Sequence, residues 1–157
     1  MNPVASMVIE HYFAYGSNMN PERVSGRGLA FDEIRPGRVE GLRLVFDKVS
    51  RKHPHAAHAN VIHAPGECVE GLLYRLRSAD EILKMDPFES APVNYGRDAV
   101  EVLSKGERIP AWTYFANRAV RRDGFRPPRY YLEHLLAGRP YLSPEYYRWL
   151  RGLECAD

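Results

Sequence analysis

Alternating apolar and polar residues run through most of this chain and predict strands with one buried face. The first expected strand covers residues 9–15, where aromatic residues are frequent. A longer extended region covers residues 31–47, and its alternation is clearest over 42–47. We expect this region to be interrupted at Pro36-Gly37 and again near Gly41, because proline and glycine weaken regular strands.

The same patterning predicts four further strands. Residues 60–63 and 68–76 are expected to be separate strands, because Pro65-Gly66 between them is a typical turn sequence. Residues 95–103 and 109–116 are expected to form a hairpin around a short polar turn that contains glycine.

Helical patterns are few and short. Residues 78–81, Ser-Ala-Asp-Glu, have the sequence of a capping box and predict a short helix. Two more helices are expected over 129–137 and 144–153, the second with Ser143 as its N-cap. Several strands, few helices and no regular strand–helix alternation indicate an α+β fold in which the strands curl into a small mixed barrel. The length fits a single domain over 1–157.

Composition places the chain among ordinary soluble domains. Hydrophobic residues make up 45% and charged residues 27%, and the formal net charge of +2 implies no strong attraction to nucleic acid or membrane. Two cysteines, Cys68 and Cys155, are too few for a disulfide framework and suit a reducing compartment. The first ten residues lack signal-peptide features, and no apolar run is long enough to span a membrane. We therefore expect a cytoplasmic protein.

The turn after the first expected strand is a candidate binding site. Aromatic residues run into Gly16-Ser17-Asn18, and Asn20-Pro21 then has the sequence of an N-cap followed by proline at the first helical position. Gly16 can adopt a positive φ, and the backbone N–H groups of such a turn point the same way and can hold an anion. A plain strand-to-helix turn is the alternative interpretation.

Glu89 is the sharpest candidate for catalysis. Ile82, Met85 and Glu89 follow helical spacing, so this carboxylate lies in line with an apolar face. Burial raises the pKa of a carboxyl group, which suits a group that must accept and return a proton. The alternative is that residues 86–89 are the N-cap and first turn of a new helix, with Glu89 as a capping carboxylate.

Segments that follow one another in order along nearly the whole chain resemble the gamma-glutamylcyclotransferase family. The glycine loop of that family is an aromatic strand ending in Tyr-Gly-Ser-Asn, which residues 13–18 match. Its catalytic glutamate lies in a Leu-Asp-x-x-Glu-Gly segment, which residues 85–89 match, although Ser90 stands where the family often has glycine. Further matches are the block 58–76, the strand 112–116 that places a tyrosine in the pocket, and the C-terminal helices over 127–146.

The resemblance implies a reaction together with its site residues. The α-amine of a gamma-glutamyl group attacks its own γ-carbonyl, which releases 5-oxoproline and a free amine without metal or cofactor. Glu89 is implied as the catalytic acid and base. The backbone of Gly16, Ser17 and Asn18 is implied to hold either the substrate α-carboxylate or the oxyanion on the γ-carbonyl. Pocket walls and hydroxyl donors are expected from three tyrosines, Tyr15, Tyr95 and Tyr114.

The leaving group stays open at this point, and so does the oligomeric state. The family includes enzymes for gamma-glutamyl amino acids, for gamma-glutamyl-lysine amines and for gamma-glutamyl-protected antibiotic intermediates. The expected partner is such a small molecule, and the segments 50–57 and 117–128 are expected to select it. The rival hypothesis is a non-catalytic binding module on the same fold, against which the retention of Glu89 with the glycine loop speaks.

Two further clusters carry weaker hypotheses. Four histidines suggest a metal site, but their spacing matches no common zinc pattern, and we expect exposed loop histidines without a metal; they are His53, His55, His58 and His63. The arginines of residues 118–129 suggest an RNA-binding barrel, but acidic residues elsewhere nearly cancel their charge. We therefore expect a solvated loop there and no nucleic-acid partner.

Overall fold

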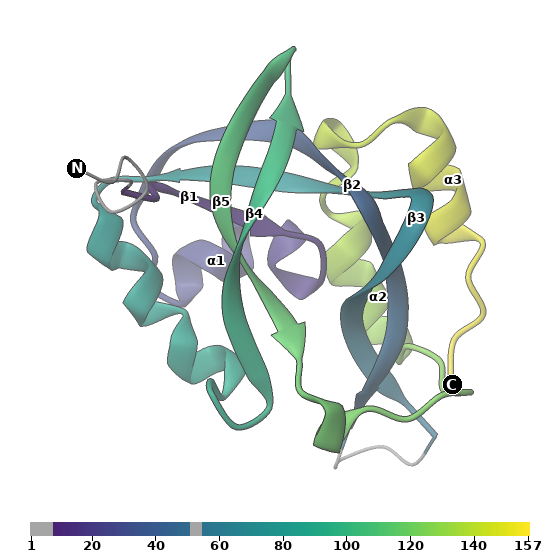
Figure 1. The fold of residues 1–157 in the computed structure, drawn as a ribbon. Helices are drawn as coiled ribbons and strands as arrows, with labels where there is room; N and C mark the ends of the chain where they lie inside the picture. The colour runs from purple at the N-terminus through teal and green to yellow at the C-terminus, as the bar shows by residue number, and fades with distance from the viewer. Residues whose placement is uncertain (1–7, 51–54) are drawn as a thin grey trace.

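The computed structural model describes residues 8–50 and 55–157, and its centre is a closed barrel of five strands (Figure 1). The strands are β1 (His11–Ala14), β2 (Phe31–Val49), β3 (Ala57–Leu76), β4 (Tyr95–Ser104) and β5 (Glu107–Ala116). Their order around the barrel is β1-β3-β2-β4-β5. Only β1 and β5, which meet at Tyr12 and Trp112, pair in parallel, and this pair closes the barrel. The expected small mixed barrel of an α+β fold is confirmed.

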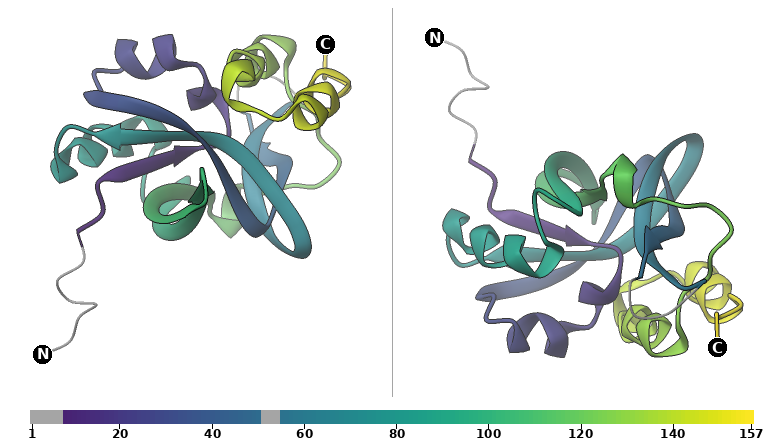
Figure 2. Two further views of the ribbon diagram at one scale, coloured as in Figure 1. Left: turned by 90° about the horizontal axis from the view of Figure 1, so that it is seen from above. Right: turned by 90° about the horizontal axis from the view of Figure 1, so that it is seen from below.

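Short helices surround the barrel. They are η2 (Ser17–Met19), α1 (Pro21–Gly26), η3 (Ala79–Lys84), η4 (Asp86–Glu89), η5 (Arg118–Val120), α2 (Arg129–Leu136), η6 (Arg139–Tyr141) and α3 (Pro144–Arg151), where η marks a 3₁₀ helix. In all the views, η3 and η4 lie on the opposite side of the molecule from α2 and α3 (Figures 1 and 2). Helix α2 packs against both α3 and η2, so the C-terminal helices reach back to the turn that follows β1.

The helix starts expected near both ends of the chain are confirmed. Asn20 caps α1, because its side-chain oxygen accepts from the N–H of Glu22 at 3.2 Å, and Pro21 is the first helical residue. Ser143 caps α3 in the same way, with its hydroxyl oxygen 3.2 Å from the N–H of Tyr146. These caps satisfy backbone donors that have no partner inside the helix.

Strands β2 and β3 form one long hairpin, which differs from the predicted shorter pieces. The strand β2 stays paired with β3 through Pro36-Gly37, so the predicted interruption there is wrong. Gly41 has a φ of 83°, and the pairing shifts beside it, so that residues 64–67 of β3 all lie opposite this one residue of β2. The predicted turn at Pro65-Gly66 is therefore a bulge inside a continuous strand, where it bends the hairpin around the barrel.

Of two local motifs predicted from the sequence, the turn between β4 and β5 is confirmed and the capping box at 78–81 is wrong. The β4–β5 hairpin turns at Lys105-Gly106, and both residues have the positive φ that a tight two-residue turn requires. The capping box at 78–81 is wrong, because Ser78 makes no capping hydrogen bond and the segment is a 3₁₀ helix. The carboxylate of Glu81 instead accepts from the N–H of Ala30 at 2.7 Å, so a tertiary contact replaces the local one.

Candidate active site

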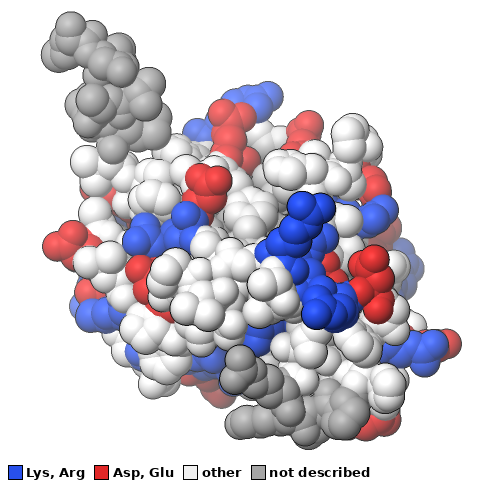
Figure 3. All heavy atoms as spheres, turned by 60° about the horizontal axis from the view of Figure 1, so that its bottom comes forward, with Lys and Arg blue, Asp and Glu red and all other residues white. Residues whose placement is uncertain are grey.

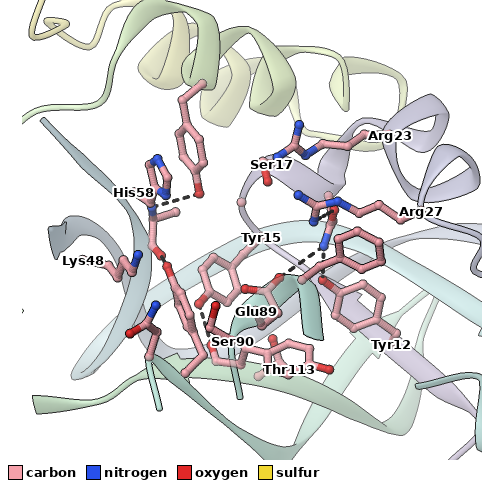
Figure 4. Close-up of a pocket in the computed structure, with 18 residues that line it drawn as sticks. Tyr12, Tyr15, Ser17, Arg23, Arg27, Lys48, His58, Glu89, Ser90 and Thr113 are labelled. Atoms are coloured by element: carbon pink, nitrogen blue, oxygen red, sulfur yellow. Dashed lines mark hydrogen bonds between the residues drawn. The ribbon is translucent and has the colours of Figure 1, made fainter. Parts of the chain in front are cut away.

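A cavity of about 230 Å³ lies beside the end of β1, and all seven residues predicted for the site line it (Figure 4). They are Tyr15, Gly16, Ser17, Asn18, Glu89, Tyr95 and Tyr114. The cavity is smaller than the roughly 300–1,000 Å³ typical of sites for drug-sized ligands, which suits a small polar ligand. Its walls come from segments far apart in the sequence: the β1–η2 turn, α1, the end of η4, strand β5 and helix α2.

Glu89 ends η4 and presents a half-buried carboxylate to this cavity. One of its oxygens accepts a hydrogen bond from the Asn18 side-chain amide at 3.3 Å. Burial raises the pKa of Glu89 to about 7, although the nearby charges of Arg27, Arg23 and Lys48 oppose this rise. A carboxyl group with a pKa near neutrality can both accept and return a proton at physiological pH.

The capping interpretation of residues 86–89 is wrong. Asp86 caps no helix, because its carboxylate accepts from the guanidinium of Arg97 at 3.0 and 3.2 Å and from the Tyr114 hydroxyl at 2.6 Å. These contacts tie η4 to β4 and β5. Ser90, which follows Glu89, has a φ of 49° in the left-handed region that favours glycine. The serine thus adopts the backbone conformation that a glycine there would take more easily.

The turn after β1 needs glycine for space rather than for a positive φ. Gly16 has a φ of −113°, and a Cβ atom on it would lie 3.1 Å from the Tyr131 hydroxyl and 3.2 Å from the Cβ of Ala59. Ser17 and Asn18 form the first turn of η2, and the first N–H groups of a helix have no acceptor inside it. Gly16, Ser17 and Asn18 therefore bring backbone close to the cavity.

The side chain of Asn18 is used within the protein. Its amide N–H groups donate to the Tyr12 hydroxyl at 2.8 Å and to Glu89, and its oxygen accepts from Arg27 at 3.0 Å. The side chain is almost fully buried, and Tyr74 donates to its backbone oxygen. Asn18 therefore fixes the position of the Glu89 carboxylate, and the part of Asn18 left for a ligand is its backbone N–H.

The three predicted tyrosines line the cavity as walls. The Tyr15 hydroxyl donates to the backbone oxygen of Tyr114, and the Tyr95 hydroxyl donates to the backbone oxygen of Ala59 at 2.7 Å. The Tyr114 hydroxyl donates to Asp86. In this structure, each hydroxyl hydrogen is thus already held by a protein oxygen. Tyr12 differs, because its hydroxyl accepts from Asn18 and keeps its own hydrogen for another acceptor.

The cavity is also lined by three cationic side chains that the sequence analysis did not single out. Arg23 and Arg27 come from α1 and its C-terminal end, and Lys48 comes from β2 on the other side of Glu89 (Figure 4). Three cations and one carboxylate give the lining a net charge of +2 when Glu89 is ionised. A cavity of this charge favours an anionic ligand. The four-residue spacing of the two arginines, on one helix face after the glycine loop, was the available signal.

The described histidines of the predicted cluster do not form one site in the structure. His53 lies outside the described residues, His55 is exposed, and His63 faces Phe115 at the barrel surface. His58 is neither in a loop nor exposed, because it lies on β3, lines the cavity and stacks on the Tyr131 ring at 4.4 Å. Within residues 8–50 and 55–157, no three His, Cys, Asp or Glu side chains are grouped to hold a metal ion.

The arginine-rich segment 118–129 packs along the ends of β2 and β3, and two of its arginines pair with acidic side chains. Arg121 lies 2.9 Å from the carboxylate of Asp47, and Arg126 lies 2.8 Å from that of Glu154. When the molecule is turned so that the bottom of Figure 1 comes forward, basic side chains are seen beside acidic ones (Figure 3).

Among the helices that the structure describes, none has the length and apolar character needed to cross a membrane.

Comparison with known proteins gives one family and a consistent fold. The model of a family described as "Gamma-glutamyl cyclotransferase, AIG2-like" matches residues 12–133. A solved structure titled "Gamma-glutamyl cyclotransferase" has a TM-score of 0.78 and 24% identity, covering 94% of this chain and 89% of that chain. The human uncharacterized protein loc79017 has a TM-score of 0.80 and 25% identity over the same shares of the two chains.

A third similar structure is YkqA from Bacillus subtilis, with a TM-score of 0.80 and 22% identity. The matched region covers 98% of this chain but only 58% of YkqA, so YkqA contains further sequence beyond this fold. A search of curated proteins found no significant match. The structural likenesses agree with the barrel and short helices described above.

Proposed function

Because the chain belongs to the AIG2-like gamma-glutamyl cyclotransferase family, we propose that it converts a gamma-glutamyl amine or gamma-glutamyl amino acid to 5-oxoproline and the free amine. The observation that carries this proposal is the Glu89 carboxyl, whose pKa of about 7 places it between proton acceptor and donor inside a small cationic cavity. The adjoining Gly16-Ser17-Asn18 backbone supplies N–H groups for an anionic part of the substrate.

The first step is activation of the substrate's own amine. An α-ammonium group beside a free carboxylate is almost entirely protonated at neutral pH and has no lone pair for attack. The ionised Glu89 accepts one of its protons, and the raised pKa of Glu89 narrows the difference in proton affinity between the two groups. The freed amine then attacks the γ-carbonyl carbon, and a bond between nitrogen and carbon closes a five-membered ring.

The second step is departure of the leaving nitrogen. Attack places a negative charge on the former carbonyl oxygen, and the N–H groups of Ser17 and Asn18 are the candidate donors for it, or else for the α-carboxylate. Glu89 gives its proton to the leaving nitrogen as the bond between carbon and nitrogen breaks. Two protons move in all from the α-nitrogen to the leaving nitrogen, each by way of Glu89, so the carboxylate ends as it began.

Orientation is the other contribution that the cavity makes. Ring closure requires the flexible glutamyl chain to be curled so that its amine meets its own carbonyl, and fixing such a geometry is a large part of many rate enhancements. Asn18 holds Glu89 from one side, and the rings of Tyr15 and Tyr114 limit the space around it. All reacting atoms belong to one substrate, so the reaction consumes no second reactant.

Product identity tests the proposal. The protein is incubated with a panel of gamma-glutamyl compounds, each with a free and an N-acetylated α-amine, and 5-oxoproline and glutamate are measured. We expect 5-oxoproline from a free form and nothing from its acetylated form, because acetylation removes the nucleophilic lone pair. Release of glutamate, or equal cleavage of both forms, would replace cyclisation by hydrolysis with Glu89 as the base for water. Tight binding of a panel member without any turnover would favour the binding module.

A further inference from the structure

Arg23 is a cavity-lining cation without an acidic partner in the part of the chain that the structure describes. Its Nη1 lies 3.3 Å from Nε2 of His134 on α2, and its Nε is buried and has no acceptor among the described residues. A guanidinium offers five N–H donors in a fixed plane, so one edge of this group is held and another is left for a ligand. Burial of such a donor without an acceptor is costly unless a ligand supplies one.

Arg97 in the same protein shows what that edge binds. Its Nε and Nη2 lie 3.0 and 3.2 Å from the two carboxylate oxygens of Asp86, a bidentate contact of the side edge. In Arg23 the contact with His134 uses Nη1, so Nε and Nη2 form the corresponding edge, and the buried Nε of that edge has no acceptor among the described residues. The other ring nitrogen of His134, Nδ1, lies 3.1 Å from the side-chain amide nitrogen of Asn20, so the imidazole lies between Asn20 and the guanidinium of Arg23.

Arg23 contacts His134 and lies outside the hydrogen-bonded network that holds Glu89. Arg27 belongs to the Glu89 network, because it donates to Asn18 and lies over the ring of Phe88 at 4.8 Å. In the view of Figure 4 the Arg27 guanidinium lies between that of Arg23 and Glu89. The substrate α-amine must reach Glu89, so the part of the substrate that contacts Arg23 lies away from this amine.

Charge matching agrees with this arrangement. A gamma-glutamyl α-amino acid carries two carboxylates and one ammonium and has a net charge of −1, whereas a gamma-glutamyl alkylamine has one of each and is neutral overall. The cavity lining, at +2 with Glu89 ionised, favours the first. We propose that Arg23 binds a carboxylate of the leaving group and so directs the enzyme to gamma-glutamyl α-amino acids, an inference that rests on the proposed function.

Two substrates that differ only in that carboxylate test the inference: gamma-glutamyl-alanine and gamma-glutamyl-ethylamine. We expect wild type to prefer the first in kcat/KM. Arg23→Gln should lower kcat/KM for gamma-glutamyl-alanine about 10- to 100-fold, as loss of a charge-assisted bidentate contact does, and change that for gamma-glutamyl-ethylamine less than about threefold. Arg23→Lys should recover only part of the loss, because lysine keeps the charge without the planar fork. Arg148→Gln, on the exposed surface of α3, is the matched control and should change neither value.

Other outcomes distinguish a failure of the role of Arg23 from a failure of the proposed function. Equal loss with both substrates in a folded Arg23→Gln protein would overturn the inference and assign Arg23 to the glutamyl half, with the proposed function intact. If wild type releases no 5-oxoproline from either compound, the proposed function fails, and calorimetric titration with the same two compounds still tests Arg23. Binding of gamma-glutamyl-alanine that Arg23→Gln weakens at least tenfold would support carboxylate recognition, and absent or unchanged binding would refute it.

Discussion

Replacing Glu89 by glutamine should make the folded protein more stable at alkaline pH. The pKa of this carboxyl is raised from an ordinary 4.5 to about 7, so the folded state disfavours its ionised form. Well below pH 4.5 the carboxyl is protonated in both the folded and the unfolded state, so the two states bind equal numbers of protons. As the pH rises from 4.5 to 7, the unfolded state ionises first and the free energy of unfolding falls, and above pH 7 the loss stays constant.

The size of the effect follows from the two pKa values. The pKa differs by about 2.5 units between the two states, and one unit corresponds to about 1.4 kcal/mol. The change in the free energy of unfolding therefore has an upper limit of about 3 kcal/mol. Part of the Glu89 side chain reaches the solvent of the cavity, so we expect a gain of about 1–3 kcal/mol for Glu89→Gln at pH 8. Glutamine keeps the oxygen that accepts from Asn18 and leaves that contact in place.

Urea unfolding of wild type and Glu89→Gln at about pH 4.5 and pH 8 measures this difference. The two proteins should agree within about 0.5 kcal/mol at the lower pH, where the linkage is small, and diverge at the higher. Glu145→Gln, on the exposed surface of α3, is the control and should show no such divergence. If Glu89→Gln gains nothing at pH 8, the carboxyl is solvated with an ordinary pKa, and the argument for its proton-transfer role fails.

The pH profile of kcat/KM should rise through about pH 7 as Glu89 loses its proton, and Glu89→Gln should lower kcat about 10²- to 10⁴-fold; a flat wild-type profile would contradict this. Gly16→Ala places a Cβ 3.1 Å from the Tyr131 hydroxyl, so thermal unfolding should show a loss of about 1–3 kcal/mol and kinetics a fall in activity of at least about tenfold. Tyr114→Phe removes a hydrogen bond to Asp86 and should cost about 1 kcal/mol in urea unfolding with less than about a tenfold loss of kcat/KM. A hundredfold kinetic loss in that variant would instead assign the hydroxyl to the substrate.

Local chemistry made much of the fold predictable. The turn at Lys105-Gly106 and the caps at Asn20 and Ser143 depend on residues within four positions of one another, and all three formed as expected. The Pro65-Gly66 turn failed because a long strand can take up extra residues in a bulge opposite Gly41. Pattern reasoning sees the turn sequence but not the partner strand that keeps pairing on both sides of it.

In the candidate site, too, the residues on short sequence segments could be predicted and the roles that depend on tertiary contacts could not. Glu89 and Gly16-Ser17-Asn18 lie on short segments that a resemblance identifies by sequence alone, and the structure brings them together at one cavity. The roles of Asn18 and Arg23 depend on tertiary contacts, with Glu89 and with His134 respectively. The four-residue spacing of Arg23 and Arg27 places them on one helix face, but the packing of α2 against the β1–η2 turn is what shows that this face lines the cavity.

Closure of the barrel by its first and last strands determines when the cavity can be complete. The hairpins β2–β3 and β4–β5 each join strands that are neighbours in the sequence, but Tyr12 pairs with Trp112, which follows it 100 positions later. Contacts so distant in sequence slow folding, because chain entropy is lost before they form. The cavity also needs Tyr131 from α2. A chain still emerging from the ribosome contains both hairpin sequences and Glu89 before it contains Tyr131, so the cavity can be complete only after α2 has been synthesised.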